Sequence, residues 1–422
     1  MSEQYYDVAV IGAGPAGLAA AAAAKEKGAE KVVVIERDFR PGGILEQCIH
    51  AGFGLKYFGE ELSGPEYAGR FIHKCGDAQI EFLVNTMVLK IDGPERIIHA
   101  VNKNGTVTIK CGAIILSMGC RERTRPQIQI PGSRPAGIYT AGAAQRFCNV
   151  QNYIVGNEIV IIGSGDIGMI MARRMTLEGA KVKGVFEIMP YLAGLTRNKV
   201  QCLDDFGIPL YLSHTVIDID GKRRVKKVTV AKVDENKRPI PGTEFDVECD
   251  TVLLSVGLIP ENELSKSAGV ELDPITKGPI VDNEMMTSVD GIFACGNVVH
   301  VNDLVDNVSR ESEIAGSAAA VFAENTKPAG QRKSVRPGDL VRYVVPQFVN
   351  PDVADDVKMY FRATEPLKNV TIYAKSGETV LFKAKKQFVN PGEMEQISVK
   401  KEMLNQQDVS DITVSIARNE VR

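Results

Sequence analysis

The sequence predicts an α/β protein with two similar βαβ units, followed by a small all-β region. Three observations predict this fold. A glycine-rich turn stands between an apolar strand and an alanine-rich helix within residues 8–36, and the same arrangement returns within residues 158–187. From Lys333 onward, short strands of alternating polarity replace the glycine turns. The 422 residues have room for two or three domains, each with its own core.

The first βαβ unit begins with an apolar strand at residues 8–11 and ends with a second apolar strand at 32–35, followed by Glu36. The turn after the first strand consists of Gly12, Ala13, Gly14, Pro15, Ala16 and Gly17. Gly12 permits a tight turn, Gly14 permits close approach of a pyrophosphate, and Gly17 permits the helix to pack closely on the sheet. The helix N-terminus offers N–H groups to phosphates. Glu36, 24 residues after Gly12, can accept both hydroxyls of an adenosine ribose. The pattern predicts a dinucleotide-binding site.

The second βαβ unit repeats this order with the same spacing. Its strand at residues 158–162 is followed by the turn Gly163, Ser164, Gly165, Asp166, Ile167 and Gly168. A helix to residue 178 and a strand that ends at Glu187 complete the unit, and Glu187 follows Gly163 by 24 residues. Two complete units predict two bound dinucleotides. A carboxylate in this place pairs with a ribose 2′-hydroxyl and repels a 2′-phosphate, and residues 188–194 contain no Arg or Lys. NAD(H) is therefore expected in preference to NADP(H).

Several shorter segments complete the chain. The loop after Glu36 contains Arg37, Gly42 and Gly43, whose backbone can approach a ligand closely. We expect helices at 64–75 and 309–324, strands at 80–84, 87–91, 113–116 and 251–255, and hairpins at 97–109 and 216–233. Residues 120–137 contain four arginines and three prolines, and we interpret them as a solvated linker between domains. Strands at 340–345, 357–362, 370–374, 380–384, 396–399 and 412–417 predict an all-β sandwich.

Composition limits the classes of function. Lys and Arg number 50 and Asp and Glu 53, a formal net charge of −3, which gives no reason to expect binding to nucleic acid or to an anionic membrane. The apolar run 8–24 lacks a basic segment before it and contains glycines and a proline, so we do not expect a signal peptide. The eight cysteines form no CxxC pair, which argues against a metal site and a secreted disulfide framework. A cytoplasmic location is expected.

With both units placed, residues 6–326 resemble the two-dinucleotide flavoproteins known as the FAD/NAD-linked pyridine nucleotide–disulfide oxidoreductases. Two strand ends, Ser117-Met118-Gly119 and Ser255-Val256-Gly257, resemble further motifs of the family, and so does the segment 291–297, which ends at Gly296 and Asn297. The resemblance implies Rossmann-like domains: a discontinuous FAD domain at 1–120 and 258–328, and an NAD domain at 121–257 inserted into it. The β sandwich would form a separate domain at 333–422.

The resemblance also implies roles for site residues. FAD would lie along the first glycine turn with Glu36 on its ribose, and Val88 would contact the adenine through its backbone. Asn297, where most members of the family have Asp, would hold the ribityl chain. NADH would lie along the second turn, and hydride would pass between nicotinamide and flavin without help from a side-chain acid or base. Three further glycines would lie beside the cofactors: Gly119, Gly257 and Gly296.

The sequence departs from the members of the family that reduce disulfides. Their Cys-x4-Cys pair would fall at Leu45 and His50, and neither is a cysteine. A dithiol relay is therefore excluded. Cys48 lies nearby, with His50 two residues later, and a flavin and a helix N-terminus could lower the pKa of its thiol enough for a catalytic redox role. The alternative is that Cys48 is a small packing residue.

Segment 41–50 and the β region resemble electron-transfer subunits of bacterial multi-subunit dehydrogenases. This favours a flavoprotein enzyme that exchanges hydride with NAD(H). Its electrons would pass to or from a small acceptor or a partner flavoprotein dehydrogenase, of the glycerol-3-phosphate or hydroxyacid type, docked on the β domain. One alternative is a reductase of peroxide, oxygen or low-molecular-weight disulfides that uses Cys48. Another is a non-catalytic scaffold subunit that contains FAD. All three hypotheses are compatible with an oligomer.

Overall fold

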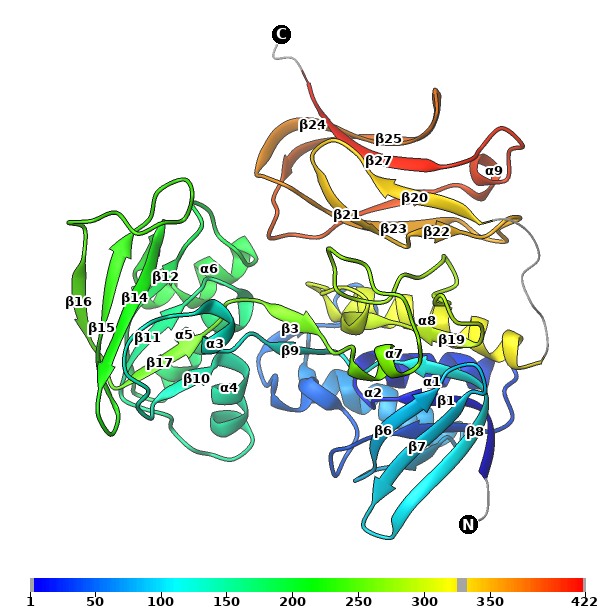
Figure 1. The fold of residues 1–422 in the computed structure, drawn as a ribbon, viewed down its shortest axis with the longest axis horizontal. Coiled ribbons are helices and arrows are strands. Elements are labelled where there is room, and N and C mark those ends of the chain that lie inside the picture. The colour runs from blue at the N-terminus through cyan, green and yellow to red at the C-terminus, as the bar shows by residue number, and fades with distance from the viewer. Residues whose placement is uncertain (1–3, 325–331, 420–422) are drawn as a thin grey trace. The chain divides into compact units, whose positions relative to one another are not determined.

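The computed structural model describes residues 4–324 and 332–419, and its contacts divide the chain into two compact units. The larger unit comprises Met1–Cys120 and Pro260–Arg422, and the smaller unit is Arg121–Ile259. The chain passes between the units through β9 (Cys120–Glu122) and β18 (Leu258–Pro260), which pair with each other. Each unit contains a sheet whose central strands are parallel, with helices packed against it (Figure 1). The predicted α/β class is confirmed.

The central sheet of the larger unit is built around the first predicted βαβ unit. Its strand order is β5-β2-β1-β8-β7-β6, and β19 pairs with β8. The pairing is parallel on both sides of β1, so Val10 lies between Val34 and Ile115. These strands are β1 (Gln4–Ile11), β2 (Val32–Ile35), β5 (Glu81–Leu83), β6 (Met87–Asp92), β7 (Ile97–Asn102), β8 (Gly105–Leu116) and β19 (Ile292–Ala294). The second arm of the predicted hairpin and the predicted strand 113–116 are thus one strand, β8, because its residues 105–110 pair with β7 while its residues 109–116 pair with β1.

The alanine-rich helix α1 (Pro15–Glu26) is buried from Ala16 to Ala24. It contacts β1 and β2 of the sheet and also α8 (Val305–Ala323), so apolar residues are needed around its whole circumference. The approach of the two helices is close: a Cβ at Gly316 of α8 would lie 2.1 Å from the carbonyl oxygen of Ala20. The helix α8 begins four residues before the predicted start at 309, since its polar first turn hides the apolar periodicity.

The smaller unit contains the second predicted βαβ unit. Its parallel sheet has the order β10-β17-β11-β12-β13, and a separate antiparallel sheet has the order β14-β15-β16. These strands are β10 (Ile138–Thr140), β11 (Glu158–Ile162), β12 (Lys181–Glu187), β13 (Leu210–Leu212), β14 (His214–Gly221), β15 (Val225–Lys232), β16 (Phe245–Glu248) and β17 (Thr251–Leu254). The helices are α3 (Arg125–Ile128), α4 (Ala141–Asn149), α5 (Asp166–Leu177) and α6 (Thr196–Cys202), with the 3₁₀ turn η2 (Asp204–Phe206).

The prediction of a solvated linker at 120–137 is wrong for one of its arginines. Arg125 is only 7% exposed. Its guanidinium donates hydrogen bonds to three backbone carbonyls of the same loop, those of Ile130, Pro131 and Ser133. These carbonyl dipoles compensate the buried charge, and desolvation lowers the pKa of Arg125. The arginine therefore stabilises the loop from inside.

The region after residue 332 forms the predicted β sandwich and has a core of its own. One sheet has the order β22-β20-β27-β24-β25 and the other β21-β23-β26. The strands are β20 (Lys333–Pro337), β21 (Val341–Val345), β22 (Phe348–Val349), β23 (Val357–Ala363), β24 (Leu367–Ser376), β25 (Thr379–Val389), β26 (Glu395–Val399) and β27 (Ile412–Arg418). All six predicted strands are present. Two others, β20 and β22, were not predicted, because β22 is too short for a period and β20 is rich in charge.

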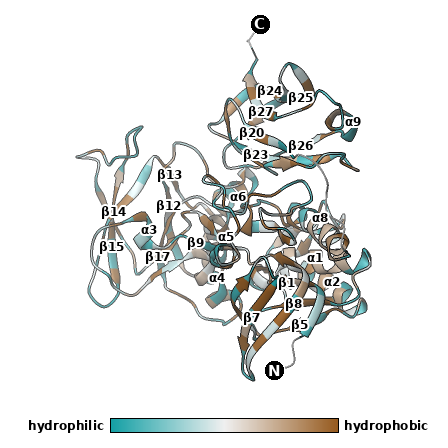
Figure 2. Ribbon diagram, turned by 45° about the vertical axis from the view of Figure 1, so that its right-hand side comes forward, coloured by the Kyte–Doolittle hydropathy of each residue, from teal (hydrophilic) through white to brown (hydrophobic). Residues whose placement is uncertain are grey.

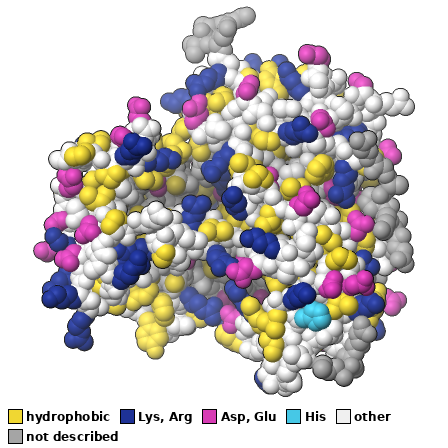
Figure 3. All heavy atoms as spheres, in the orientation of Figure 1, with side chains coloured by type: hydrophobic (Ala, Val, Ile, Leu, Met, Phe, Trp, Pro, Cys, Tyr) yellow, Lys and Arg dark blue, Asp and Glu magenta, His cyan; other side chains and the backbone are white. Residues whose placement is uncertain are grey.

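The remaining elements of the larger unit surround its sheets. They are η1 (Gly43–Gln47), β3 (Ala51–Phe53), β4 (Leu62–Ser63), α2 (Gly64–Asp77), α7 (Glu263–Ser267), η3 (Gly296–Val298) and α9 (Lys401–Leu404). Figure 2 shows hydrophobic residues concentrated in the sheet that contains β1 and β8. On the face drawn in Figure 3, basic and acidic side chains are interspersed. Within the described ranges, no helix is both long enough and apolar enough to cross a lipid bilayer.

Candidate functional site

The glycine turn of the larger unit is tightly packed at its first and third glycines and open at its second. Gly12 has φ +103°, and a Cβ there would lie 2.7 Å from the carbonyl oxygen of Ser117. A Cβ at Gly17 would lie 1.8 Å from the carbonyl oxygen of Gly12. A Cβ at Gly14, in contrast, would meet no atom within 4 Å. Packing therefore requires the first and third glycines, while the second faces open space beside the N-terminus of α1, where a phosphate fits.

The carboxylate of Glu36 is held in place by the backbone around this turn. Its Oε2 atom accepts a hydrogen bond from the N–H of Ala13, and its Oε1 atom accepts one from Asp38, both at 2.8 Å. The residue is 8% exposed. Each oxygen keeps a further lone pair, because a carboxylate oxygen can accept two hydrogen bonds. The carboxylate is thus fixed next to the turn and can still accept the two hydroxyls of a ribose.

Two further segments that the sequence assigned to this site pack directly on the turn. The N–H of Gly42 donates to the carbonyl of Ala13 at 2.8 Å, and a Cβ at Gly43 would lie 2.8 Å from Cα of Gly14. A Cβ at Gly296 would lie 2.7 Å from Cβ of Ala16. Loops that are far apart in the sequence therefore converge on one helix N-terminus, and glycine is needed at each point of contact.

Three other residues were assigned to this site: Arg37, Gly119 and Val88. Arg37 is exposed beside Glu36, and Gly119 has φ +72° with no atom near its missing Cβ. The side chain of Val88 is buried in β6, where the register with β7 shifts between Val88 and Lys90. The backbone of Glu36 pairs with that of Leu83 and Thr86, and the expected contact of the Val88 backbone with adenine stays a prediction.

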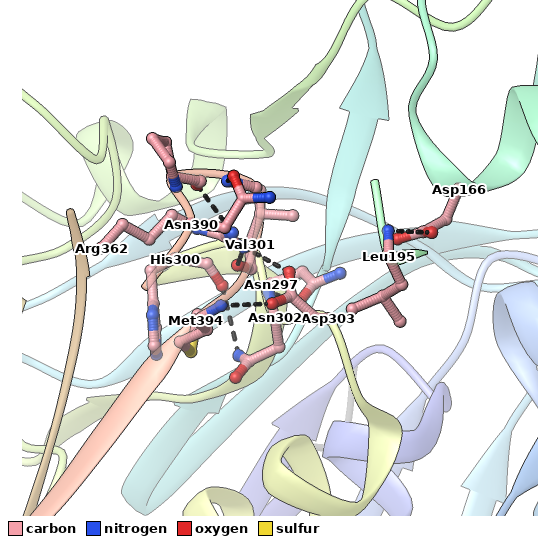
Figure 4. Close-up of polar contacts among 12 residues, drawn as sticks. Asp166, Leu195, Asn297, His300, Val301, Asn302, Asp303, Arg362, Asn390 and Met394 are labelled. Carbon is pink, nitrogen blue, oxygen red and sulfur yellow. Dashed lines mark hydrogen bonds and ion pairs between the residues drawn. The ribbon is translucent and has the colours of Figure 1, made fainter. Parts of the chain in front are cut away.

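Asn297 stands in a network of hydrogen bonds that the sequence did not reveal (Figure 4). Its Oδ1 atom accepts from the N–H of Asn302 at 2.9 Å, and its Nδ2 group lies 3.8 Å from Sγ of Cys120. The preceding residue, Gly296, donates its N–H to Glu311 at 2.8 Å. The other oxygen of Glu311 lies 2.8 Å from Nε2 of His300, and both of these side chains are almost fully buried.

The second glycine turn repeats the geometry of the first at its first and third glycines, whereas a Cβ at its middle glycine, Gly165, would lie 2.9 Å from Oγ of Ser255. Gly163 has φ +90°, and a Cβ there would lie 2.2 Å from the carbonyl oxygen of Ser255, which corresponds to Ser117. A Cβ at Gly168 would lie 2.6 Å from Cβ of Ser255. The carboxylate of Glu187 accepts from the N–H and hydroxyl of Ser164, both at 2.8 Å, and from the N–H of Met189 at 2.9 Å. The serines that close the two turns belong to the strand-end motifs, but the sequence predicted no role for them.

The two turns differ in the loop that comes after the acidic residue. The hydroxyl of Ser164 accepts from the N–H of Ala193 at 2.9 Å, and the carboxylate of Asp166 accepts from Leu195 at 2.8 Å and from Asn198 at 2.6 Å. These bonds hold the loop after β12 against the turn; the one between Asp166 and Leu195 is drawn in Figure 4. Gly194, against which Asp166 packs, follows Gly163 by 31 residues, as Gly43 follows Gly12. That spacing is a signal that could have identified it.

The last two residues assigned to the second site also lie in the smaller unit. Ile167, the second residue of α5, is partly buried and packs against the core of the smaller unit. Gly257 has φ +102°, and its carbonyl accepts a hydrogen bond from the N–H of Arg123 at 3.0 Å. The loop after β17 is therefore attached to the segment that follows β9.

Cys48 directly follows the 3₁₀ turn η1, and its carbonyl accepts a hydrogen bond from the N–H of Gly64, the first residue of α2, at 2.8 Å. Its thiol donates to the carbonyl of Ile44 at 3.3 Å, and burial raises the pKa of the thiol from 9.0 to about 12. The expectation of a lowered pKa is wrong, because desolvation of the thiolate dominates. Nδ1 of His50 lies 3.1 Å from the carbonyl oxygen of Ala51, and its ring lies 5.0 Å from that of Phe53.

Comparison with known proteins adds to this geometry. The profile of the pyridine nucleotide-disulphide oxidoreductases matches residues 6–319. An opine oxidase subunit of Agrobacterium tumefaciens (strain Ach5) is 26% identical over 337 residues, which cover 76% of this chain and 65% of that protein. Hydrogen cyanide synthase subunit HcnB of Pseudomonas aeruginosa is 28% identical over 283 residues, 62% of this chain and 59% of that protein. The chain thus spans less than two thirds of the length of either relative.

A solved structure matches the fold over a similar range. Thioredoxin reductase of T. acidophilum superposes with a TM-score of 0.60 at 24% identity, and the match covers 76% of this chain and 99% of that one. At this identity the similarity concerns the fold alone.

Proposed function

The chain belongs to the pyridine nucleotide-disulphide oxidoreductase family, and from this premise we propose that it is an FAD-dependent oxidoreductase that exchanges hydride with NAD(H). Members of the family bind FAD and NAD(P)H. The observation that carries the proposal is the pair of glycine turns, each closed by a serine and each followed by a buried acid held by backbone N–H groups. One dinucleotide site would suffice for a simple binding protein, whereas two fit an exchange of electrons between two cofactors.

In this proposal the larger unit binds FAD. The N-terminus of α1 and the open side of Gly14 receive the pyrophosphate, and Glu36 accepts the ribose hydroxyls. Gly296 and Asn297 serve the ribityl chain. When bound, FAD and NADH supply the hydride chemistry, so the residues of the chain need only bind, orient and exclude water.

The smaller unit binds NAD(H) in preference to NADP(H). Glu187 has both oxygens engaged and lies at the carboxyl end of β12, where the adenosine ribose of a dinucleotide binds in such sheets. A 2′-phosphate would bring a second negative charge next to a buried carboxylate that cannot turn away, which disfavours NADP(H).

The second half of the reaction involves another protein or a small acceptor. The opine oxidase relative and HcnB are both named as subunits, which favours a partner subunit here too. We infer a flavoprotein dehydrogenase of the hydroxyacid or glycerol-3-phosphate type, docked on the β sandwich. The absence of a cysteine at Leu45 and His50 and the raised pKa of Cys48 both disfavour reduction of disulfides as the main reaction.

Anaerobic stopped-flow absorption tests the proposal. The protein loaded with FAD is mixed with NADH or NADPH, and the flavin band is followed, after which a panel of acceptors is used for reoxidation. We expect NADH to bleach the flavin at least about tenfold faster than NADPH at equal concentration. If neither nucleotide reduces the flavin, the protein is a scaffold and the proposal is wrong. Rapid turnover of a small acceptor by the protein alone would contradict the need for a partner.

A further inference from the structure

One buried side chain of the β sandwich makes several polar contacts near the segment that carries Asn297. This side chain is Arg362 in β23, and its guanidinium donates hydrogen bonds to four acceptors. It donates to the carbonyls of Val301 at 3.2 Å and Pro391 at 3.3 Å. Its Nε–H group donates to the hydroxyl of Tyr343 at 3.2 Å, and it forms an ion pair with Asp303. The two charged side chains of this pair are 14% and 13% exposed.

Asp303 is bound from the sandwich on both of its oxygens. Its Oδ1 atom accepts from Arg362, and its Oδ2 atom accepts from the N–H of Met394, in the loop before β26 (Figure 4). A carboxylate and a guanidinium that are both removed from water are stabilised only if their hydrogen bonds are satisfied in this way. The turn His300-Val301-Asn302-Asp303, called here the 300–303 turn, is therefore attached to the sandwich at its end.

The start of the same turn is attached to the Gly296–Asn297 segment. The N–H of Asn302 donates to Oδ1 of Asn297 at 2.9 Å. His300 and Gly296 both contact the carboxylate of Glu311, each at 2.8 Å. The ring of His300 also packs near two tyrosines of the sandwich, with centroid distances of 6.3 Å to Tyr343 and 5.7 Å to Tyr360. The 300–303 turn is thus a short bridge between the sandwich and Asn297.

From this bridge we propose that Arg362 is a positioning residue for FAD. Through Asp303 it holds the 300–303 turn in place, and through the N–H of Asn302 the turn holds Oδ1 of Asn297. The amide plane of Asn297 is thereby fixed, with its Nδ2 group 3.8 Å from Sγ of Cys120. The inference rests on the proposed function, in which Asn297 serves the ribityl chain. It means that the β sandwich is part of the flavin site, in addition to any role in binding a partner.

Two substitutions test the proposal with little change in volume. Arg362→Lys keeps the positive charge but loses the planar fork that reaches four acceptors at once. Asp303→Asn keeps the size but replaces one of the two acceptor oxygens with an NH₂ donor. That donor then faces either the guanidinium or the N–H of Met394, and one hydrogen bond is lost. The matched control is Gln347→Ala. Gln347 joins the same two regions, because its Oε1 atom accepts from the N–H of Val281 at 3.0 Å, but it makes no contact with the 300–303 turn in the hydrogen bonds described.

The measurement is the dissociation constant of FAD, determined by titrating the FAD-depleted full chain and following the quenching of flavin fluorescence. Thermal unfolding of each apoprotein is recorded in parallel. We expect Arg362→Lys and Asp303→Asn to raise the dissociation constant about tenfold, since one charge-assisted hydrogen bond is lost from the bridge. The apoprotein of Gln347→Ala should be destabilised to a similar degree while its dissociation constant changes less than about twofold.

The outcomes separate the two proposals. If the wild-type chain binds no FAD, the proposed function is wrong and the inference falls with it. If the wild-type chain binds FAD but the two variants bind it equally well, only the positioning role is wrong. If Gln347→Ala weakens FAD binding to the same extent, the effect is a general loss of stability, and this also overturns the inference. A KM for NADH that stays unchanged in all three variants would place the effect at the flavin end.

Discussion

The substitution Gly14→Ala separates the role of the first turn in binding from its role in folding. Gly14 is the N-cap of α1 and has φ −75° and ψ −175°, which alanine adopts without strain. An added Cβ would meet no protein atom within 4 Å. The fold should therefore tolerate the methyl group, whereas a pyrophosphate that approaches the backbone at this point should not.

The magnitudes can be worked from this geometry. Alanine is a poorer N-cap than glycine by about 0.5–1 kcal/mol, and the lower entropy of the unfolded chain offsets roughly 0.4–1 kcal/mol of that cost. The apoprotein should lose less than about 1 kcal/mol of its free energy of unfolding. A charged hydrogen bond to a phosphate is worth about 1.5–3 kcal/mol, so displacement of one such bond should raise the dissociation constant of FAD by roughly 10- to 100-fold.

The assay is fluorescence titration of the FAD-depleted protein, together with chemical unfolding of the apoprotein. Gly69→Ala is the control, because it lies on the exposed side of α2 and its Cβ would also meet no atom within 4 Å. Gly17→Ala is the opposite case: its Cβ would lie 1.8 Å from a carbonyl oxygen, so the apoprotein itself should be destabilised, as overpacking costs roughly 1–3 kcal/mol. FAD affinity in Gly14→Ala within about twofold of the wild type would refute the assignment of this turn.

Three other predictions concern Glu187 and Ser164 of the second site and Cys48. Glu187→Gln should raise the KM for NADH about tenfold and reduce the preference for NADH over NADPH in steady-state assays, because a neutral amide no longer repels a 2′-phosphate; an unchanged preference would contradict the assignment. Ser164→Ala should raise the KM for NADH roughly threefold to tenfold without loss of bound FAD, because it removes hydrogen bonds to Glu187 and to the loop after β12, and Ala13 in the first turn shows that alanine fits this position. Cys48→Ser should retain NADH-dependent reduction of the flavin, and loss of this activity would revive a redox role. Because burial raises the pKa of Cys48 from 9.0 to about 12, its contribution to stability is complete below pH 9 and is lost as the pH rises toward 12, so the wild type should lose more of its free energy of unfolding than Cys48→Ser over this range in urea titrations.

Much of the fold could be predicted because its signals are local. The strand β2 was predicted with its observed bounds, and the order of strand, glycine turn, helix, strand and acid was found in both units. In each of these segments the period of apolar residues and the steric demands of glycine act within a few residues. The start of α8 was missed by four residues, because the polar residues Asp306 and Asn307 in its first turn obscure the apolar pattern.

The candidate site was only partly predictable. The glycines and the two acids carry a recognisable spacing, but the donors that hold each acid do not. For example, the hydroxyl of Ser164 donates to Glu187 across 23 residues. The same is true of the bond that closes the turn, in which Oγ of Ser255 accepts from the N–H of Gly168 across 87 residues. The pKa of Cys48 was predicted in the wrong direction, because proximity to a glycine turn in the sequence says nothing about how completely the surrounding chain removes water from a thiol.

By itself, the sequence determined that the chain contains two βαβ units with acids at equal offsets and an all-β region after them. These features depend on backbone sterics and on apolar periodicity, which act between residues close in the chain. The tertiary structure alone decided that Gly43 and Gly296 meet the same helix N-terminus and that Arg362 binds Asp303, 59 residues away. Such contacts depend on how complete sheets and helices pack together, and no local pattern encodes that packing.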